Sequence, residues 1–207
     1  MVFDQEGSLG QPINILPDQP LTEKEKLSIR GELEAITLAE SGQLEKALER
    51  LDEVIQENPL WASAFNNRAQ IKRLLKRPFN DVYTDLTRSI ELVLTSSDSE
   101  DPNAITERRS KVLAQAFTQR SALLSSTFLS PGSTPPTKQG FSELERLDPR
   151  LTSLIGLEEV ANDDMIRGAR YGNPLAKSMS LKMNPYSKMC DRIVKEAILG
   201  EIKSAQS

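Results

Sequence analysis

Two pairs of adjacent carboxylates, Glu158-Glu159 and Asp163-Asp164, are residues whose type could support acid–base chemistry or bind a divalent cation. Consecutive helical residues point in different directions, however, and no calcium-loop spacing surrounds either pair. The 207 residues include no histidine, which removes the commonest general base and the usual nitrogen ligand for zinc. The sequence therefore argues against an enzyme and predicts neither a cofactor nor a metal ion.

The rest of the composition indicates the cellular compartment and the class of binding partner. The lone cysteine, Cys190, cannot form an intrachain disulfide and is expected to be a small core residue. No signal-like leader follows Met1, and no apolar run is long enough to cross a membrane. The 30 Asp and Glu residues outnumber the 26 Lys and Arg residues, and no basic stripe suits nucleic acid. We expect a soluble cytoplasmic protein, with the nucleus left open as a second location, that binds neither nucleic acid nor membrane.

Helices are expected to position the functional side chains, because the sequence pattern of a helical hairpin occurs twice over residues 29–92. In the first copy, Ala35 and Ala47 are small enough for two helices to approach closely. Gly42 suits a left-handed helix end between them, and Pro59 closes the unit. This pattern resembles a tetratricopeptide repeat, and it predicts an all-α fold of three such hairpins in a short right-handed solenoid with C-terminal capping helices.

The chain divides into a lead-in, three hairpins, an insertion and a cap. A flexible lead-in is expected over 1–21, and a capping box of Thr22 and Glu25 starts the helical domain, 22–203. The expected parts are repeat 1 at about 27–60, repeat 2 at about 61–95, repeat 3 at about 102–124 plus 157–172, an insertion at about 125–156 and a cap at about 174–203. Single helices are expected over about 44–57, 80–95 and 104–124. The insertion is rich in Ser, Thr and Pro, which predicts an exposed loop, and the turn at 76–78 holds an extra residue.

Several segments narrow the resemblance to one family. Residues 61–70, 85–86, 117–120 and 183–186, together with Cys190, resemble the tetratricopeptide repeat protein 36 family. The resemblance covers roughly residues 27–194 outside the Ser125–Leu157 region, and it implies three repeats and a non-catalytic intracellular adaptor. Members of that family have been linked to chaperones of the Hsp70 class and to tyrosine catabolism. The resemblance therefore implies a protein partner, such as an Hsp70-class chaperone or a metabolic enzyme.

The first helices of the three hairpins are expected to form the inner wall of a groove. Its predicted partner-binding residues are Glu32, Ile36, Asn66, Asn67, Gln70, Arg73, Gln115, Thr118 and Gln119, with Ala122 on the same wall. Amide side chains both donate and accept hydrogen bonds, so they suit the backbone of an extended protein segment. The alternative is that Asn66 and Asn67 brace a neighbouring helix, because buried polar groups must be paired.

The best-known use of this fold is a clamp that holds the terminal carboxylate of a chaperone tail with lysine, arginine and two asparagines. Asn67 stands at one asparagine position of that clamp. Glu32 and Ile36 stand where the clamp has a lysine and an asparagine, and Gln115 and Gln119 stand where it has a lysine and an arginine. Because charge-assisted donors make carboxylate recognition strong, we expect no tail clamp here. A chaperone link would need another surface.

Two further surfaces give rival hypotheses. The basic cluster of Lys72, Arg73, Lys76 and Arg77 could attract an acidic partner, although such a run usually forms a solvated face. The insertion could instead make the protein a regulatory subunit through phosphorylation. The acceptors would be Ser125, Ser126, Ser130, Ser133 and Thr134. In that case the groove residues would be dispensable.

Overall fold

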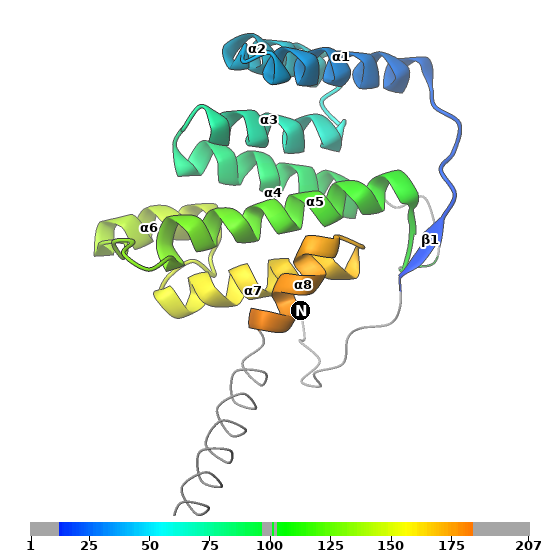
Figure 1. Cartoon of the computed structure of the whole chain (residues 1–207). Helices are drawn as coiled ribbons and strands as arrows, with labels where there is room; N and C mark the ends of the chain where they lie inside the picture. Colours follow the sequence, from blue (N-terminus) through cyan, green and yellow to red (C-terminus); the bar gives the residue numbers. More distant parts are fainter. Residues whose placement is uncertain (1–12, 97–100, 102, 184–207) are drawn as a thin grey trace, which may run out of the picture.

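The computed structural model describes residues 13–96, 101 and 103–183, and its helices stack on one another in chain order (Figure 1). The elements are β1 (Asn14–Leu16), α1 (Glu23–Glu40), α2 (Leu44–Glu57), α3 (Ala62–Leu74), α4 (Phe79–Thr95), β2 (Ala104–Thr106), α5 (Glu107–Leu124), the π-helix η1 (Ser125–Leu129), α6 (Lys138–Leu147), α7 (Leu154–Arg170) and α8 (Pro174–Met183). Apart from two strands of 3 residues each, the described protein is all-α. Within these ranges, every helix is too short or too polar to span a lipid bilayer.

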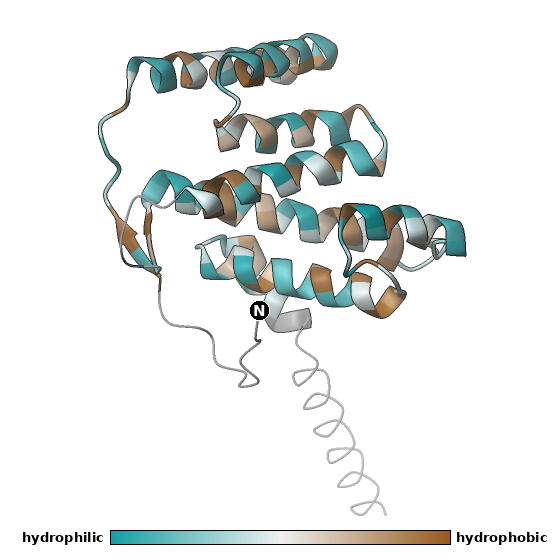
Figure 2. Ribbon diagram, turned by 180° about the vertical axis from the view of Figure 1, so that it is seen from behind, coloured by the Kyte–Doolittle hydropathy of each residue, from teal (hydrophilic) through white to brown (hydrophobic). Residues whose placement is uncertain are grey.

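The helices pack most extensively as the pairs α1 with α2, α3 with α4, and α5 with α7, and α8 then packs on α7. Small residues permit the close approach that the sequence predicts, because Ala35 and Ala47 are both fully buried in the first pair. Gly31 makes the approach closer still, since a Cβ atom there would lie 2.4 Å from a methyl group of Val54. Hydrophobic residues alternate with polar ones along these helices (Figure 2), and the described buried residues form three clusters, one between the first and second pairs and two between the second and third.

The same turn joins the helices in three places. Gly42, Lys76 and Gly172 adopt left-handed backbone conformations, with φ of 81°, 55° and 99°. In each turn the next amide bonds back to a carbonyl five residues earlier, at 2.9 Å from Gln43 to Leu38, 2.9 Å from Arg77 to Lys72, and 3.0 Å from Asn173 to Gly168. The connection between α3 and α4 runs over 75–78, against 41–43 after α1, so the predicted extra residue is confirmed.

An arginine–carboxylate pair joins the two helices of each pair. The Nε atom of Arg50 in α2 lies 2.7 Å from Glu34 in α1. In the second pair the charges are exchanged, and Arg68 of α3 forms two bonds, of 2.6 and 2.9 Å, with Asp85 of α4. The third pair repeats that arrangement between α5 and α7, as described next.

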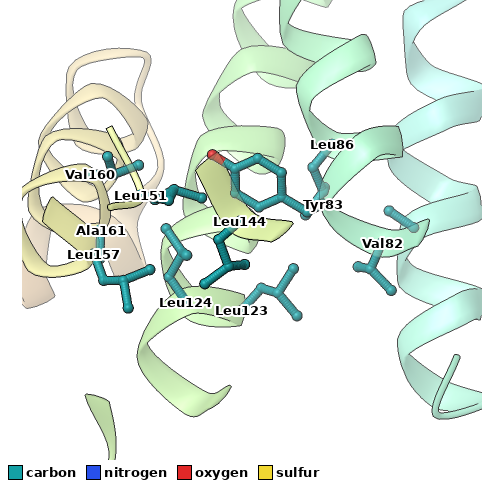
Figure 3. Packing of buried hydrophobic residues seen from close by; sticks show 11 residues of the cluster. Val82, Tyr83, Leu86, Leu123, Leu124, Leu144, Leu151, Leu157, Val160 and Ala161 are labelled. Carbon is teal, nitrogen blue, oxygen red and sulfur yellow. The ribbon is translucent and has the colours of Figure 1, made fainter. Parts of the chain in front are cut away.

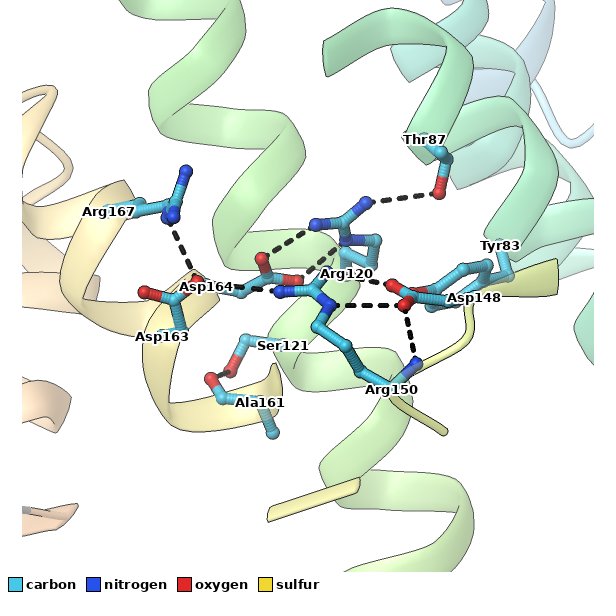
Figure 4. A network of polar contacts seen from close by, with 10 residues as sticks. All are labelled: Tyr83, Thr87, Arg120, Ser121, Asp148, Arg150, Ala161, Asp163, Asp164 and Arg167. Carbon is cyan, nitrogen blue, oxygen red and sulfur yellow. Dashed lines mark hydrogen bonds and ion pairs between the residues drawn. The ribbon is translucent and has the colours of Figure 1, made fainter. Parts of the chain in front are cut away.

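Arg120 of α5 forms two hydrogen bonds with Asp164 of α7, at 2.7 and 2.8 Å (Figure 4). Both side chains are almost fully buried, at 6% and 0% exposed. Arg120 also bonds Thr87 of the preceding pair at 3.1 Å, just as Arg68 reaches back to Asp52 at 2.7 Å. Although burial alone would lower the pKa of Arg120, its bonds to Asp164 raise it. Arg68 and Arg120 therefore each connect their own pair to the pair before it.

The insertion differs from the exposed loop that its composition predicts. It contains η1 and α6, and Leu144 and Leu151 are buried beside Tyr83 and Leu86 of α4 (Figure 3). The Pro- and Ser-rich composition describes only the residues before α6. The segment that follows is amphipathic, so α6 forms by covering apolar surface that α4 and α5 would otherwise expose to water.

Polar contacts hold the end of the insertion in place (Figure 4). The Tyr83 hydroxyl donates to Asp148 at 2.9 Å, and the Arg150 guanidinium and amide donate to the same carboxylate at 2.7 to 3.0 Å. Burial alone would raise the pKa of Asp148, but these bonds lower it from its ordinary 3.8 to about 2. Asp148 is therefore ionised across most of the pH range and anchors the insertion to α4.

The lead-in and the start of the third hairpin also differ from the sequence prediction. Residues 14–16, expected to be flexible, form β1, which pairs in parallel with β2. Residues 104–106, expected to be helical, form β2, and α5 begins only at Glu107. The Asp18 carboxylate accepts a 2.8 Å bond from the Arg108 amide and so caps α5 from a distance. The predictions for residues 1–12, Pro102, Cys190 and the cap beyond Met183 lie outside the described residues.

Replacing Lys76 with glycine should stabilise the protein. A side chain in the left-handed region costs about 1 kcal/mol, and glycine carries no such cost. We expect Lys76→Gly to raise the free energy of unfolding by about 0.5 to 1 kcal/mol in urea denaturation. The matched change Gly42→Lys should lower it by a similar amount, and equal stabilities for the three proteins would contradict this account of the turn.

Replacing Asp148 with asparagine should destabilise the protein in a pH-dependent way. The folded-state pKa of Asp148 is depressed, so its contribution is complete above about 4 and is lost as the pH falls towards 2. After allowance for solvent screening, we expect Asp148→Asn to cost about 1 to 2 kcal/mol at neutral pH. Urea denaturation at pH 7 and near pH 2.5 should show this difference shrinking, whereas a constant difference would contradict the ionic role.

Candidate functional site

The two carboxylate pairs that could suggest catalysis have structural partners. Asp164 is paired with Arg120 inside the molecule, whereas Asp163 faces outward towards Arg167 at 3.0 Å and Arg150 at 3.7 Å. Burial raises the pKa of Asp164, and the two bonds from Arg120 oppose that effect. In the described part of the chain, no three acidic or cysteine side chains gather closely enough to hold a metal ion. Glu158 and Glu159 are exposed to solvent. The aspartate pair therefore forms ion pairs, and the glutamate pair is part of a solvated surface.

Two of the four residues of the basic cluster form ion pairs with carboxylates of neighbouring helices. Lys72 pairs with the buried Asp85 at 2.7 Å, and Arg77 pairs with Glu45 of α2 at 2.8 Å. Arg73 and Lys76 are exposed. Half of the cluster therefore helps to join helices, and only Arg73 among the predicted binding residues presents a positive charge to solvent beside the first helices of the pairs.

Five of the predicted binding residues meet along the side of the molecule formed by α1, α3 and α5, which we call the inner face. Glu32 of α1 accepts hydrogen bonds from Asn67 of α3 and from the indole of Trp61, the residue before α3, both at 2.8 Å. Burial raises the pKa of Glu32, and hydrogen bonds from Trp61, Ser63 and Asn67 oppose that effect. Asn67, the clamp asparagine, therefore already donates to a carboxylate of this chain.

The preceding residue, Asn66, connects α3 to α5. Asn66 is 2% exposed, donates to Gln115 at 3.2 Å and accepts from Gln119 at 3.2 Å. The Gln119 Oε1 atom is buried and has no hydrogen-bond partner within the described ranges. The geometry thus favours the bracing role that the sequence left open for Asn66 and Asn67, because both bonds run between neighbouring helices.

The other predicted residues separate into two groups. Ile36, Gln70 and Arg73 are exposed on α1 and α3 and remain available to a partner. Thr118 lies elsewhere, because its hydroxyl would be 2.5 Å from a Cβ atom added at Gly168 of α7. It packs inside the α5–α7 pair and bonds the Ala114 carbonyl at 2.6 Å, so the structure removes it from the inner face. Ala122 is half-buried on α5.

The inner face also contains a cleft of about 410 Å³ that sequence reasoning missed. It lies at the starts of α1, α3 and α5, and its walls include Ile29, Leu60, Trp61, Arg108 and Val112, with Glu32 among them. This volume falls in the range of about 300 to 1,000 Å³ that is usual for ligand pockets. Trp61, the sole tryptophan of the chain, was a signal for this place, since large aromatic residues often anchor a bound partner.

Comparison with known proteins finds several similar sequences. Over 76% of its length, the chain is 30% identical to the L-tyrosine degradation gene cluster protein hmgX of Aspergillus fumigatus, of which the match covers 67%. It is 28% identical to tetratricopeptide repeat protein 36 of Homo sapiens, covering 91% of this chain and 75% of that protein. The protein of the same name from Danio rerio is 29% identical, with 81% and 67% covered. No model of a known protein family matches the chain.

Alanine substitutions should separate bracing residues from exposed ones on the inner face. Asn66→Ala leaves Gln115 and Gln119 without their partner, so we expect it to lower the free energy of unfolding by about 1 to 3 kcal/mol. Gln70→Ala removes an exposed side chain one turn away and should change it by less than about 0.5 kcal/mol. Urea denaturation of both variants measures this, and equal losses would contradict the assignment.

Proposed function

We infer the function of this protein from its relatives, since the chain belongs to the tetratricopeptide repeat protein 36 family. We propose that it is a non-catalytic adaptor built of three tetratricopeptide hairpins in a short solenoid, and that it binds a segment of a protein partner on its inner face. The observation that carries this proposal is the inner face itself, which combines an open cleft with exposed side chains of α1 and α3.

Recurring contacts support the three-hairpin architecture. The arginine–carboxylate pair joins α1 to α2, α3 to α4 and α5 to α7, and the left-handed turn lies between the two helices of the first and second pairs. A contact that recurs at equivalent places is what stacked copies of one unit would produce. In this proposal, the insertion with α6 interrupts the third hairpin, and α8 covers part of its open end.

The names of the relatives suggest the process. The fungal relative is named for an L-tyrosine degradation gene cluster, and we propose that this chain also acts in tyrosine degradation, by holding a protein of that process. An Hsp70-class chaperone is a second proposed partner. It would not bind through a tail clamp, because Glu32 already takes the donor that Asn67 would give to a carboxylate.

The rival hypothesis, that the insertion is regulatory, applies to fewer residues than the sequence suggests. Leu144 and Leu151 belong to the core, so only the loop before α6 could change its structure freely. The Ser133 hydroxyl donates to the Ser130 carbonyl at 2.7 Å within that loop. A phosphate there would act locally, and the inner face remains the better supported binding surface.

Two negative charges introduced on the inner face should weaken partner binding without unfolding the chain. We expect Ile36→Glu with Arg73→Glu to reduce capture of a bound partner at least tenfold, which corresponds to about 1.4 kcal/mol. The matched control is Ile166→Glu with Arg88→Glu, because Ile36 and Ile166 are 41% and 48% exposed and both arginines are exposed. Pull-down from the source organism, with intact helicity checked by circular dichroism, measures this.

The same variants test the link to tyrosine. In the source organism, deletion of the gene should slow the consumption of tyrosine, and the unmodified chain and the control variant should restore it. Failure of the inner-face variant to restore it supports the proposal. Restoration by that variant, combined with loss of function in a Ser130→Ala, Ser133→Ala and Thr134→Ala variant, would transfer the function to the insertion.

A further inference from the structure

The cleft on the inner face contains a buried carboxylate whose hydrogen-bond donors are all neutral. Glu32 is 7% exposed and accepts from the Trp61 indole and the Asn67 amide. Among the described residues, no lysine or arginine forms an ion pair with it. A buried carboxylate without a counter-ion is costly, and neutral donors compensate only part of the lost hydration. Glu32 therefore lacks the positive charge that would best stabilise it.

The other charged groups of the cleft are committed to other partners. Glu25 of α1 closes the capping box, where it accepts from the Thr22 amide at 2.8 Å. Arg108 of α5 lies 3.6 Å from the carboxylate of Asp18, and Arg109 donates to the Val93 carbonyl of α4. The cleft thus holds a buried carboxylate without an ion-pair partner beside an aromatic ring, and its two arginines bond other groups.

We propose that the cleft binds a lysine or arginine side chain from the protein segment that the inner face holds. The cationic group would pair with Glu32 and lie against Trp61, whose ring attracts cations, while the aliphatic stem would contact Ile29 and Val112. This proposal rests on the proposed function and specifies the chemistry of the partner. The cleft would thus prefer a positively charged group, whereas a carboxylate clamp prefers a negatively charged one.

The single tryptophan allows a direct test on the full chain. The indole N–H signal of Trp61 in a ¹H–¹⁵N spectrum reports on the cleft, because that group donates to Glu32. The probes are the Nα-acetyl methylamides of lysine, norleucine and glutamate, which share a backbone and differ in charge. We expect the lysine probe to move this signal saturably, with a Kd at least tenfold lower than that of the norleucine probe.

Glu32→Gln should remove the preference for the lysine probe. Because that variant loses an acceptor and could unfold, the pH dependence of the unmodified chain provides a second measurement. Protonation of Glu32 should weaken the lysine probe as the pH falls and leave the norleucine probe unchanged. Glu25, Arg108 and Arg109 also face this cleft, but the pKa of Glu25 is lowered by its bonds to Thr22, so Glu25 is protonated only at lower pH.

Three outcomes would overturn the proposal: equal binding of the lysine and norleucine probes, tighter binding of the glutamate probe, or no movement of the Trp61 signal with any probe. The last two results would leave the inner-face adaptor intact if Ile36→Glu with Arg73→Glu still releases the partner. Loss of the proposed function would instead appear as partner binding that survives that inner-face variant.

Discussion

The structure depends on one repeated interaction, the pairing of an arginine with a carboxylate between the two helices of each pair. Glu34 with Arg50, Arg68 with Asp85, and Arg120 with Asp164 occupy equivalent places, and the first of these has the charges exchanged. The second and third pairs are largely buried, and buried ion pairs contribute little net stability because desolvation offsets their attraction. Their value here is geometric: in these two pairs, two hydrogen bonds between planar groups favour one rotation and one register of the helices, whereas the more exposed Arg50–Glu34 pair forms one bond. Apolar side chains alone would tolerate several rotations and registers.

Local signals predicted most helices well, because each signal acts within a few residues. The capping box of Thr22 and Glu25 is present, and α2 covers 44–57 as expected. What the sequence concealed depends on residues far apart in the chain. Three features depend on a partner that no local pattern identifies: the pairing of β1 with β2, the burial of Leu144 beside Tyr83, and the contact of Asp18 with α5.

The binding residues were predictable to the extent that the helical phase was known. Gly42 and the turn at Lys76 fix the phase of α1 and α3, and the expected residues of these helices lie on the inner face. The third hairpin lacks such a turn between its own helices, because the insertion takes that place. Without such a turn the phase of α5 was ambiguous, and Thr118 was assigned to the inner face, although it lies about 60° from Gln115 and about 100° from Gln119 around the helix.

The pairing of β1 with β2 has a consequence for how the molecule unfolds. Stacked repeats behave as a one-dimensional array, in which terminal units can unravel one at a time. Here the segment before α1 is fastened to the entrance of α5, so the first two helix pairs lie within a noncovalent ring. The first pair cannot fray without opening that ring. The end of the array is thereby coupled to its middle, and cooperativity extends across units that contact only their neighbours.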